Sequence, residues 1–245
     1  MQQEWEEVVR NKASLRDLLM KPQHLRPLFI TVCVMVFMQT SGIMPVLSNL
    51  SVIFKAAGSS LSPNTSAMLV GVVQVLASVT SALLVDHTGR KVLLVLSASI
   101  MSLTLVVLGI YFALIEGDEG GGGSRSGEWV EEHLSWLPLT SLIIYFIGFC
   151  LGFGTIPWLL MSELFSPAVR DAASGLVIMV NWIVSFGITF VFQSLQDSVG
   201  ASWVFLILAG FCLLAAIFSA LVVPETKGLT LQQVSALFTA TSSEA

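Results

Sequence analysis

Residues 92–107 read VLLVLSASIMSLTLVV and contain no charged side chain. A strand of a membrane β-barrel would alternate apolar and polar residues over about 10 positions, and this stretch shows no sustained two-residue alternation. It belongs to an uncharged run, 92–115, that exceeds the roughly 20 residues a helix needs to cross the hydrocarbon core of a bilayer. The stretch therefore predicts a transmembrane helix, because a helix satisfies its own backbone hydrogen bonds in lipid.

Five other runs in the 245-residue chain are free of charged residues and similarly long. They are 27–54, 56–85, 133–162, 172–196 and 198–224. Only 11% of the chain is charged and 55% is apolar, whereas an ordinary soluble domain has about 25% charged residues. The prediction is an all-α polytopic membrane protein with six transmembrane helices, at about 28–54, 66–85, 92–115, 134–162, 172–196 and 201–223.

The rest of the chain divides around these helices. We expect residues 1–26 to form a cytosolic amphipathic segment, since apolar residues such as Trp5 and Leu15 recur among charged ones until Pro22. Residues 27–224 form the six-helix domain, with an extracytoplasmic loop at 116–133 that is rich in glycine and acids. Residues 225–245 form a cytosolic tail.

Lysine and arginine are distributed unequally between the two sides of this topology. Only Lys55 and Arg125 fall on one side. The other side holds Arg10, Lys12, Arg16, Lys21, Arg26, Arg90, Lys91, Arg170 and Lys227. Positive charge accumulates in cytoplasmic segments, so both termini are predicted to be cytosolic, in an integral protein of the plasma membrane. The net charge of −5 argues against nucleic acid as a partner.

The spans lack the groups that an intramembrane enzyme requires. The histidines His24, His87 and His133 fall in connecting segments, and the uncharged spans contain no acid. The Ser41-Gly42 and Ser174-Gly175 pairs have no histidine base within a span to activate the serine. We therefore expect no catalysis, no metal site and no cofactor.

Neutral polar and aromatic side chains do occur near the middle of the spans. Those of most interest are Gln39, Gln74, Trp158 and Asn181. An amide offers donors and an acceptor to vicinal hydroxyls, and an indole offers an apolar face to a sugar ring. The alternative is that each amide only bonds a neighbouring helix, because polar groups within a bilayer also stabilise helix packing.

The first span carries Ser41-Gly42-Ile43-Met44-Pro45. Proline removes a backbone donor and glycine loosens the turn, so a kink or break is expected here. Broken helices near the midplane recur in transporter sites, although a plain packing kink is the alternative.

Two polar turns on the cytoplasmic side combine acids with bases. One runs from Asp86 to Lys91 (DHTGRK) and the other from Glu163 to Arg170 (ELFSPAVR). Opposite charges placed at helix ends can bridge the helices and separate when the helices move apart, as in a gate. The alternative is that these charges only enforce topology.

Together, these motifs resemble the C-terminal six-helix half of a sugar porter of the major facilitator superfamily, most closely the facilitated trehalose and glucose transporters. The resemblance runs from about Ser14 to Val234. Besides the two turns, it rests on Gln39-Thr40-Ser41-Gly42, Ile53-Phe54, Gly152 to Trp158, Asn181-Trp182 with Phe186, and Pro224 to Gly228.

The resemblance implies facilitated diffusion of a hexose or trehalose by alternating access. It implies that Gln39, Gln74, Trp158 and Asn181 face the sugar. It further implies that a cytoplasmic gate is formed by Asp86, Arg90, Glu163, Arg170 and Glu225. The chain departs from the family pattern at Met38, Met44, Ser48-Asn49 and Thr155, where the family usually has glutamine, asparagine, a tyrosine pair and proline.

Family members have twelve helices and bind sugar between two six-helix halves, and this chain resembles the second half. The partners expected from the resemblance are a small-molecule sugar, the lipid bilayer, and either an N-terminal half or a second chain. The alternative hypothesis is a truncated membrane protein that transports nothing and only associates with other helices.

Overall fold

The computed structural model of the chain describes residues 18, 22–56, 62–119, 133–229 and 233. Most of the expected amphipathic segment (1–26), of the expected outer loop (116–133) and of the tail (225–245) lies outside these residues. Within the described ranges, six helical segments are long and apolar enough to cross a membrane. The prediction of an all-α, six-span protein is confirmed.

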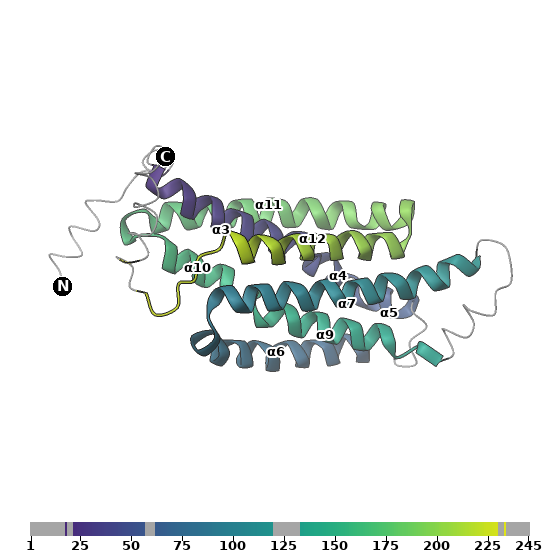
Figure 1. Cartoon of the computed structure of the whole chain (residues 1–245). Helices are drawn as coiled ribbons and strands as arrows, with labels where there is room; N and C mark the ends of the chain where they lie inside the picture. Colours follow the sequence, from purple (N-terminus) through teal and green to yellow (C-terminus); the bar gives the residue numbers. More distant parts are fainter. Residues whose placement is uncertain (1–17, 19–21, 57–61, 120–132, 230–232, 234–245) are drawn as a thin grey trace.

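Eight α-helices make up these spans, and one more short helix, Leu50–Ala56, follows the first span (Figure 1). The first span, His24–Ser48, and the fourth, Leu137–Leu164, each consist of two helices, and the other spans are continuous helices. In chain order the helices of the described residues are α3 (Pro22–Thr40), α4 (Ile43–Ser48), α5 (Leu50–Ala56), α6 (Pro63–Thr88), α7 (Arg90–Glu119), α9 (Leu137–Leu151), α10 (Ile156–Leu164), α11 (Pro167–Val199) and α12 (Ala201–Leu221).

The break in the first span occurs where the sequence predicts it. Gly42, between α3 and α4, has φ +86°, a left-handed conformation that glycine adopts without the penalty of a side chain. A Cβ at this position would lie 2.5 Å from Cδ1 of Leu208 on α12. The backbone conformation therefore requires glycine, and a larger residue would also displace the Leu208 side chain.

The fourth span is also interrupted, between α9 and α10, so the prediction of one helix over 134–162 is wrong at this point. The N–H groups of Gly152 and Gly154 both donate to the carbonyl of Phe149 in place of regular helical bonds. A Cβ on Gly152 would lie 2.6 Å from the backbone oxygen of Leu93 on α7. The glycine allows α9 to approach α7 closely, and α10 restarts with Pro157 in its first turn.

The spans run back and forth along one axis, with α7 and α12 at the centre of the bundle (Figure 1). On one side α7 packs against α9, which contacts α6; on the other side α12 packs against α3, which contacts α11. The α7–α12 pair thus joins two layers of helices. One end of the bundle, which we call the Arg90 end, holds the starts of α7 and α11; the opposite end, the Glu116 end, holds the start of α12.

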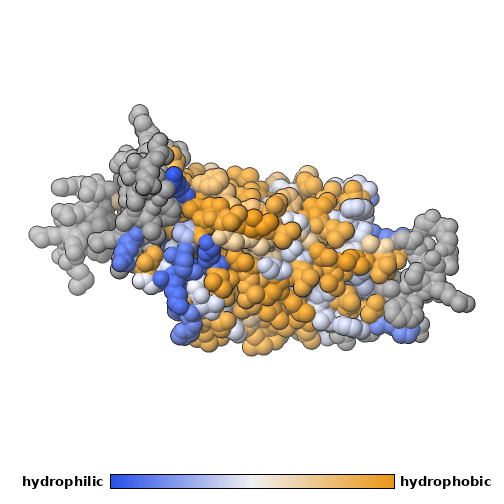
Figure 2. All heavy atoms as spheres, in the orientation of Figure 1, coloured by the Kyte–Doolittle hydropathy of each residue, from blue (hydrophilic) through white to orange (hydrophobic). Residues whose placement is uncertain are grey.

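The outer helices expose wide apolar surfaces. In the most apolar 18-residue windows of α6 and α11, only 22% of the residues are buried, compared with 50% in α7. Apolar side chains cover the length of the bundle, and hydrophilic residues gather at the Arg90 end (Figure 2). This surface suits lipid or another helical unit.

Candidate functional site

Two of the predicted polar residues meet in the interior of the bundle. Gln39, at the end of α3, donates a hydrogen bond from Nε2 to Oδ1 of Asn181 on α11, at 2.9 Å. Both side chains are 1% exposed. The Oε1 atom of Gln39 is buried and accepts no hydrogen bond from any described residue. A buried acceptor without a partner is energetically costly, so a hydroxyl donor that reached it would be bound favourably.

Tyr145 braces the helix break next to this pair, a contact that the sequence analysis missed. Its hydroxyl donates to the backbone oxygen of Ser41 at 3.1 Å, and the tyrosine is fully buried. The Ser41 hydroxyl donates in turn to the carbonyl of Met38 at 2.7 Å. A phenol in the middle of an apolar span is the signal that could have indicated it, because a buried tyrosine hydroxyl usually needs a partner.

The other two predicted sugar-facing residues remain partly exposed and do not join the Gln39–Asn181 hydrogen bond. Gln74 is half-buried on α6, and Trp158 in the first turn of α10 is 37% exposed. On α11, Trp182 and Phe186 are also exposed, next to Asn181 in sequence or one turn from it. The site therefore has two parts. One is the buried Gln39–Asn181 pair, and the other is a set of partly exposed side chains, an amide and aromatic rings, that do not contact it through a hydrogen bond.

At the Arg90 end, two of the predicted gate residues form an ion pair. Arg90, at the start of α7, approaches Oε1 of Glu163 on α10 with Nε at 3.1 Å and Nη2 at 2.9 Å. The two side chains are 11% and 21% exposed. The remaining guanidinium nitrogen, Nη1, donates to the carbonyl of Val85 at 3.1 Å. The pair is charge-assisted and largely removed from solvent, and it connects two different spans.

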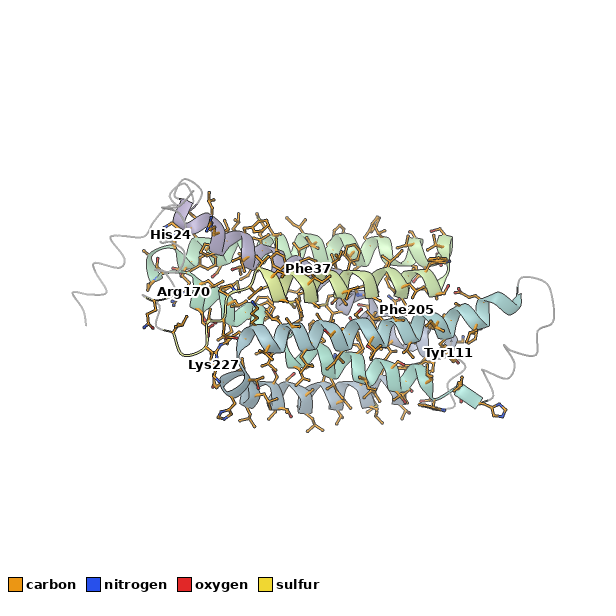
Figure 3. All side chains as sticks on the ribbon, in the orientation of Figure 1. His24, Phe37, Tyr111, Arg170, Phe205 and Lys227 are labelled. Carbon is orange, nitrogen blue, oxygen red and sulfur yellow. The ribbon has the colours of Figure 1, made fainter. Side chains whose placement is uncertain are left out.

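Asp86 and Arg170 take little part in this ion pair. Asp86 lies 3.5 Å from Nη2 of Arg90 and is 74% exposed, so the contact contributes little. The Nη2 atom of Arg170 lies 3.4 Å from the carbonyl of Phe165, and its buried Nε meets no acceptor among the described residues. Figure 3 shows Arg170 at the same end of the bundle as Lys227.

Glu225, the fifth predicted gate residue, contacts backbone groups. Its carboxylate accepts from the N–H of Arg90 at 3.0 Å, of Lys91 at 3.2 Å and of Lys227 at 3.0 Å. The Lys227 ammonium donates to the carbonyl of His87 at 2.6 Å. The segment after α12 is thereby fastened to the start of α7.

Thr226 also belongs to this cluster; the sequence places it in the motif from Pro224 to Gly228 but predicts no role for it. Its hydroxyl donates to Oε2 of Glu163, and the residue is 4% exposed. Glu163 therefore divides its two oxygens between Arg90 of α7 and Thr226 beyond α12. No sequence pattern indicates this bond, because 63 positions separate its partners.

The described residues include no group of three or more His, Cys, Asp or Glu side chains that could hold a metal ion. The chemistry available to the site is hydrogen bonding by amides, contact with aromatic faces, and a largely buried ion pair.

Comparison with known proteins identifies relatives along most of the chain. The family model described as "Sugar (and other) transporter" matches residues 1–238. The facilitated trehalose transporter Tret1 of Drosophila yakuba is 40% identical over 216 residues, which cover 88% of this chain and 24% of that protein. The facilitated trehalose transporter Tret1-2 homolog of Drosophila simulans is 39% identical over the same length, with 42% of it covered.

Solved structures of a xylose transporter share the fold. The proton:xylose symporter XylE bound to 6-bromo-6-deoxy-D-glucose aligns with a TM-score of 0.71 at 26% identity, over 86% of this chain and 42% of that one. The inward-open conformation of XylE from E. coli gives a TM-score of 0.69 at 25% identity. The chain thus spans about a quarter to two-fifths of the length of the proteins it matches.

Proposed function

This chain belongs to the sugar (and other) transporter family of the major facilitator superfamily, a family of transporters rather than enzymes, and from that premise we propose that it forms one six-helix half of a sugar transporter. The proposed activity is facilitated diffusion of a hexose or trehalose. The relatives named as trehalose transporters support this substrate class.

The observation that carries the proposal is the buried Gln39–Asn181 pair with its unpartnered acceptor. A sugar hydroxyl approaching Oε1 of Gln39 would satisfy that acceptor, and a neutral amide pair binds a neutral polyol without the cost of burying a charge. Because the affinity of such a site depends on each hydrogen bond, the loss of one amide should weaken binding strongly.

Gln74 and Trp158 complete the proposed binding surface. Both keep exposed area, so a ligand can reach them. The indole of Trp158 offers an apolar face to a pyranose ring and an N–H to a hydroxyl. The exposed Trp182, beside Asn181, enlarges the aromatic surface.

The Arg90 end is the proposed cytosolic gate. Its residues are Asp86, Arg90, Glu163, Arg170 and Glu225, with the Arg90–Glu163 pair as the contact most sensitive to movement. Helices α7 and α10 would separate as the cytosolic side opens, which would exchange the ion pair for hydration. The orientation follows the excess of Lys and Arg at this end, in a protein of the plasma membrane with both termini cytosolic.

Alternating access requires a second six-helix unit, from a longer polypeptide or from a second chain. The exposed faces of α6 and α11 offer it a surface. A chain without such a unit would be the alternative, a membrane protein that only associates with other helices.

Uptake of labelled trehalose and glucose tests the proposal in liposomes that hold the chain paired with the N-terminal half of a family member. We expect Gln39→Ala and Asn181→Ala each to raise the half-saturation concentration about tenfold or more, the effect of losing a buried hydrogen bond. The matched control is Gln193→Ala, an exposed amide on the same helix as Asn181. Unchanged kinetics in both Gln39→Ala and Asn181→Ala would refute the sugar site, and absence of flux from the pair would favour the alternative.

A further inference from the structure

Glu116, near the end of α7, binds the start of a different helix at the Glu116 end of the bundle. Its carboxylate accepts the N–H of Ala201 at 2.7 Å, the N–H of Ser202 at 3.4 Å, and the Ser202 hydroxyl. Ala201 and Ser202 are the first two residues of α12, whose N–H groups have no acceptor within the helix. A negative charge here also interacts favourably with the helix dipole.

At the Arg90 end the same arrangement exists with the roles of α7 and α12 exchanged. Glu225, a few residues after the end of α12, accepts the N–H groups of Arg90 and Lys91, the first two residues of α7. A carboxylate of α7 therefore caps the N-terminus of α12, and a carboxylate of the segment that follows α12 caps the N-terminus of α7. We call this pair of contacts the reciprocal caps.

Both caps also have the same local backbone. The residue before each capped helix is a glycine, Gly89 with φ +100° and ψ 151°, and Gly200 with φ +87° and ψ 159°. Only glycine adopts this region readily. A Cβ would lie 2.7 Å from Oε2 of Glu225 at Gly89, and 2.9 Å from Oε2 of Glu116 at Gly200. The two carboxylates occupy the space that a side chain would fill.

Close packing continues between the caps. A Cβ on Gly109 of α7 would lie 3.2 Å from the backbone oxygen of Ser202, and the Ser102 hydroxyl donates to the carbonyl of Ala209 at 2.9 Å. The rings of Phe112 and Phe205 stack with their centroids 5.4 Å apart. Figure 3 shows Phe205 and Tyr111 on these neighbouring helices. The two helices are thus joined at both ends and along their length.

We infer that α7 and α12 move as one rigid unit, with Glu116 as a positioning residue and with Glu225 as the gate residue that stays in place as a cap while the contacts of Glu163 break. If Glu225 departed, two backbone donors at the start of α7 would be left without partners. The contacts of Glu163 are with the side chains of Arg90 and Thr226, so breaking them leaves no backbone donor of α7 without a partner. The assignment of the moving contact to Glu163 rests on the proposed transport function; the reciprocal caps do not.

Hydrogen–deuterium exchange of the whole chain in lipid nanodiscs tests the caps without any transport. In Glu116→Ala, exchange at the amides of Ala201 and Ser202 should accelerate about five- to tenfold, the typical effect of losing an N-cap, while Arg90 and Lys91 stay unchanged. Glu225→Ala should produce the opposite pattern. Glu116→Gln, which keeps an acceptor oxygen, should give a smaller acceleration at the same two amides.

Asp197→Ala is the matched control, since this acid lies at the same end of the bundle and its side chain bonds the exposed Gln193. It should leave the amides of both caps unchanged. The caps would be refuted by unchanged exchange at Ala201 and Ser202 in both Glu116 variants. They would also be refuted if both helix starts accelerated equally, because that result indicates general destabilisation.

Cross-linking then tests rigidity in the paired, transporting form, with Cys33, Cys150 and Cys212 replaced by alanine. A short thiol linker between Ser102→Cys and Ala209→Cys should leave uptake within about twofold of the same uncross-linked protein. A linker between Arg90→Cys and Glu163→Cys should reduce uptake at least about tenfold. Blocked uptake with the first linker would overturn the rigid unit. Loss of uptake in every uncross-linked form would count against the proposed transport alone.

Discussion

The interior amide pair and the Arg90 end show opposite ways of placing polar groups in a membrane helix bundle. Gln39 and Asn181 are neutral, fully buried and joined by one hydrogen bond, and one acceptor remains without a partner among the described residues. Arg90 and Glu163 are charged and lie at the bundle end, and their polar atoms are satisfied by each other, by Val85 and by Thr226. An incomplete neutral pair suits a ligand, whereas a complete charged pair suits a contact between two conformations.

The largest effect that follows from this comparison is at the charged pair. Glu163→Ala should leave the Arg90 guanidinium, which is 11% exposed, without its carboxylate and should lower the free energy of unfolding by about 3 kcal/mol. Unfolding in mixed detergent micelles measures it. Asp86→Ala is the control, and because Asp86 is 74% exposed the expected loss is below about 0.5 kcal/mol. Equal losses of unfolding free energy in Glu163→Ala and Asp86→Ala would mean that the burial of Glu163 does not make its ion pair stronger.

A smaller effect is expected where Tyr145 braces the break beside the amide pair. Tyr145→Phe removes the 3.1 Å hydrogen bond to the carbonyl of Ser41 while keeping the ring in place. The expected loss of unfolding free energy is about 1 kcal/mol, together with faster amide exchange at Gly42 and Ile43. Unaltered exchange there would show that Gly42 and its packing on Leu208 hold the break without the tyrosine.

The sequence predicts the six spans and the first break for simple physical reasons. Charges are too costly at bilayer depth, so uncharged runs mark the helices, and Gly42 with Pro45 marks a point where a regular helix is difficult to maintain. The roles of Gln39, Gln74, Trp158 and Asn181 stay predictions, although the structure joins two of them.

Contacts between distant segments explain what the sequence did not predict. Glu116 appears in the sequence only as the first charge after a span, and its partner helix begins 85 residues later. Gln39 and Asn181 are separated by 142 positions. A pattern of residue types identifies polar groups at depth, but the pairs they form depend on which helices become neighbours.

The double variant Gln39→Leu with Asn181→Leu should have the smallest effect on stability. It should nevertheless abolish sugar binding, so the two effects differ most in this variant. Removing both partners of a buried hydrogen bond, and with them the unpartnered Oε1, leaves no polar group at these two positions, so unfolding free energy should change by less than about 1 kcal/mol or increase. Gln39→Leu alone should lower it by about 1 to 2 kcal/mol, because the Asn181 amide then loses its donor. Unfolding of the two variants in mixed micelles, without sugar, measures the difference. If the double variant were as unstable as Gln39→Leu alone, the amide pair would be a packing element of the bundle. If the double variant were stable and failed to bind sugar, the Gln39–Asn181 pair would serve ligand binding and would not stabilise the fold.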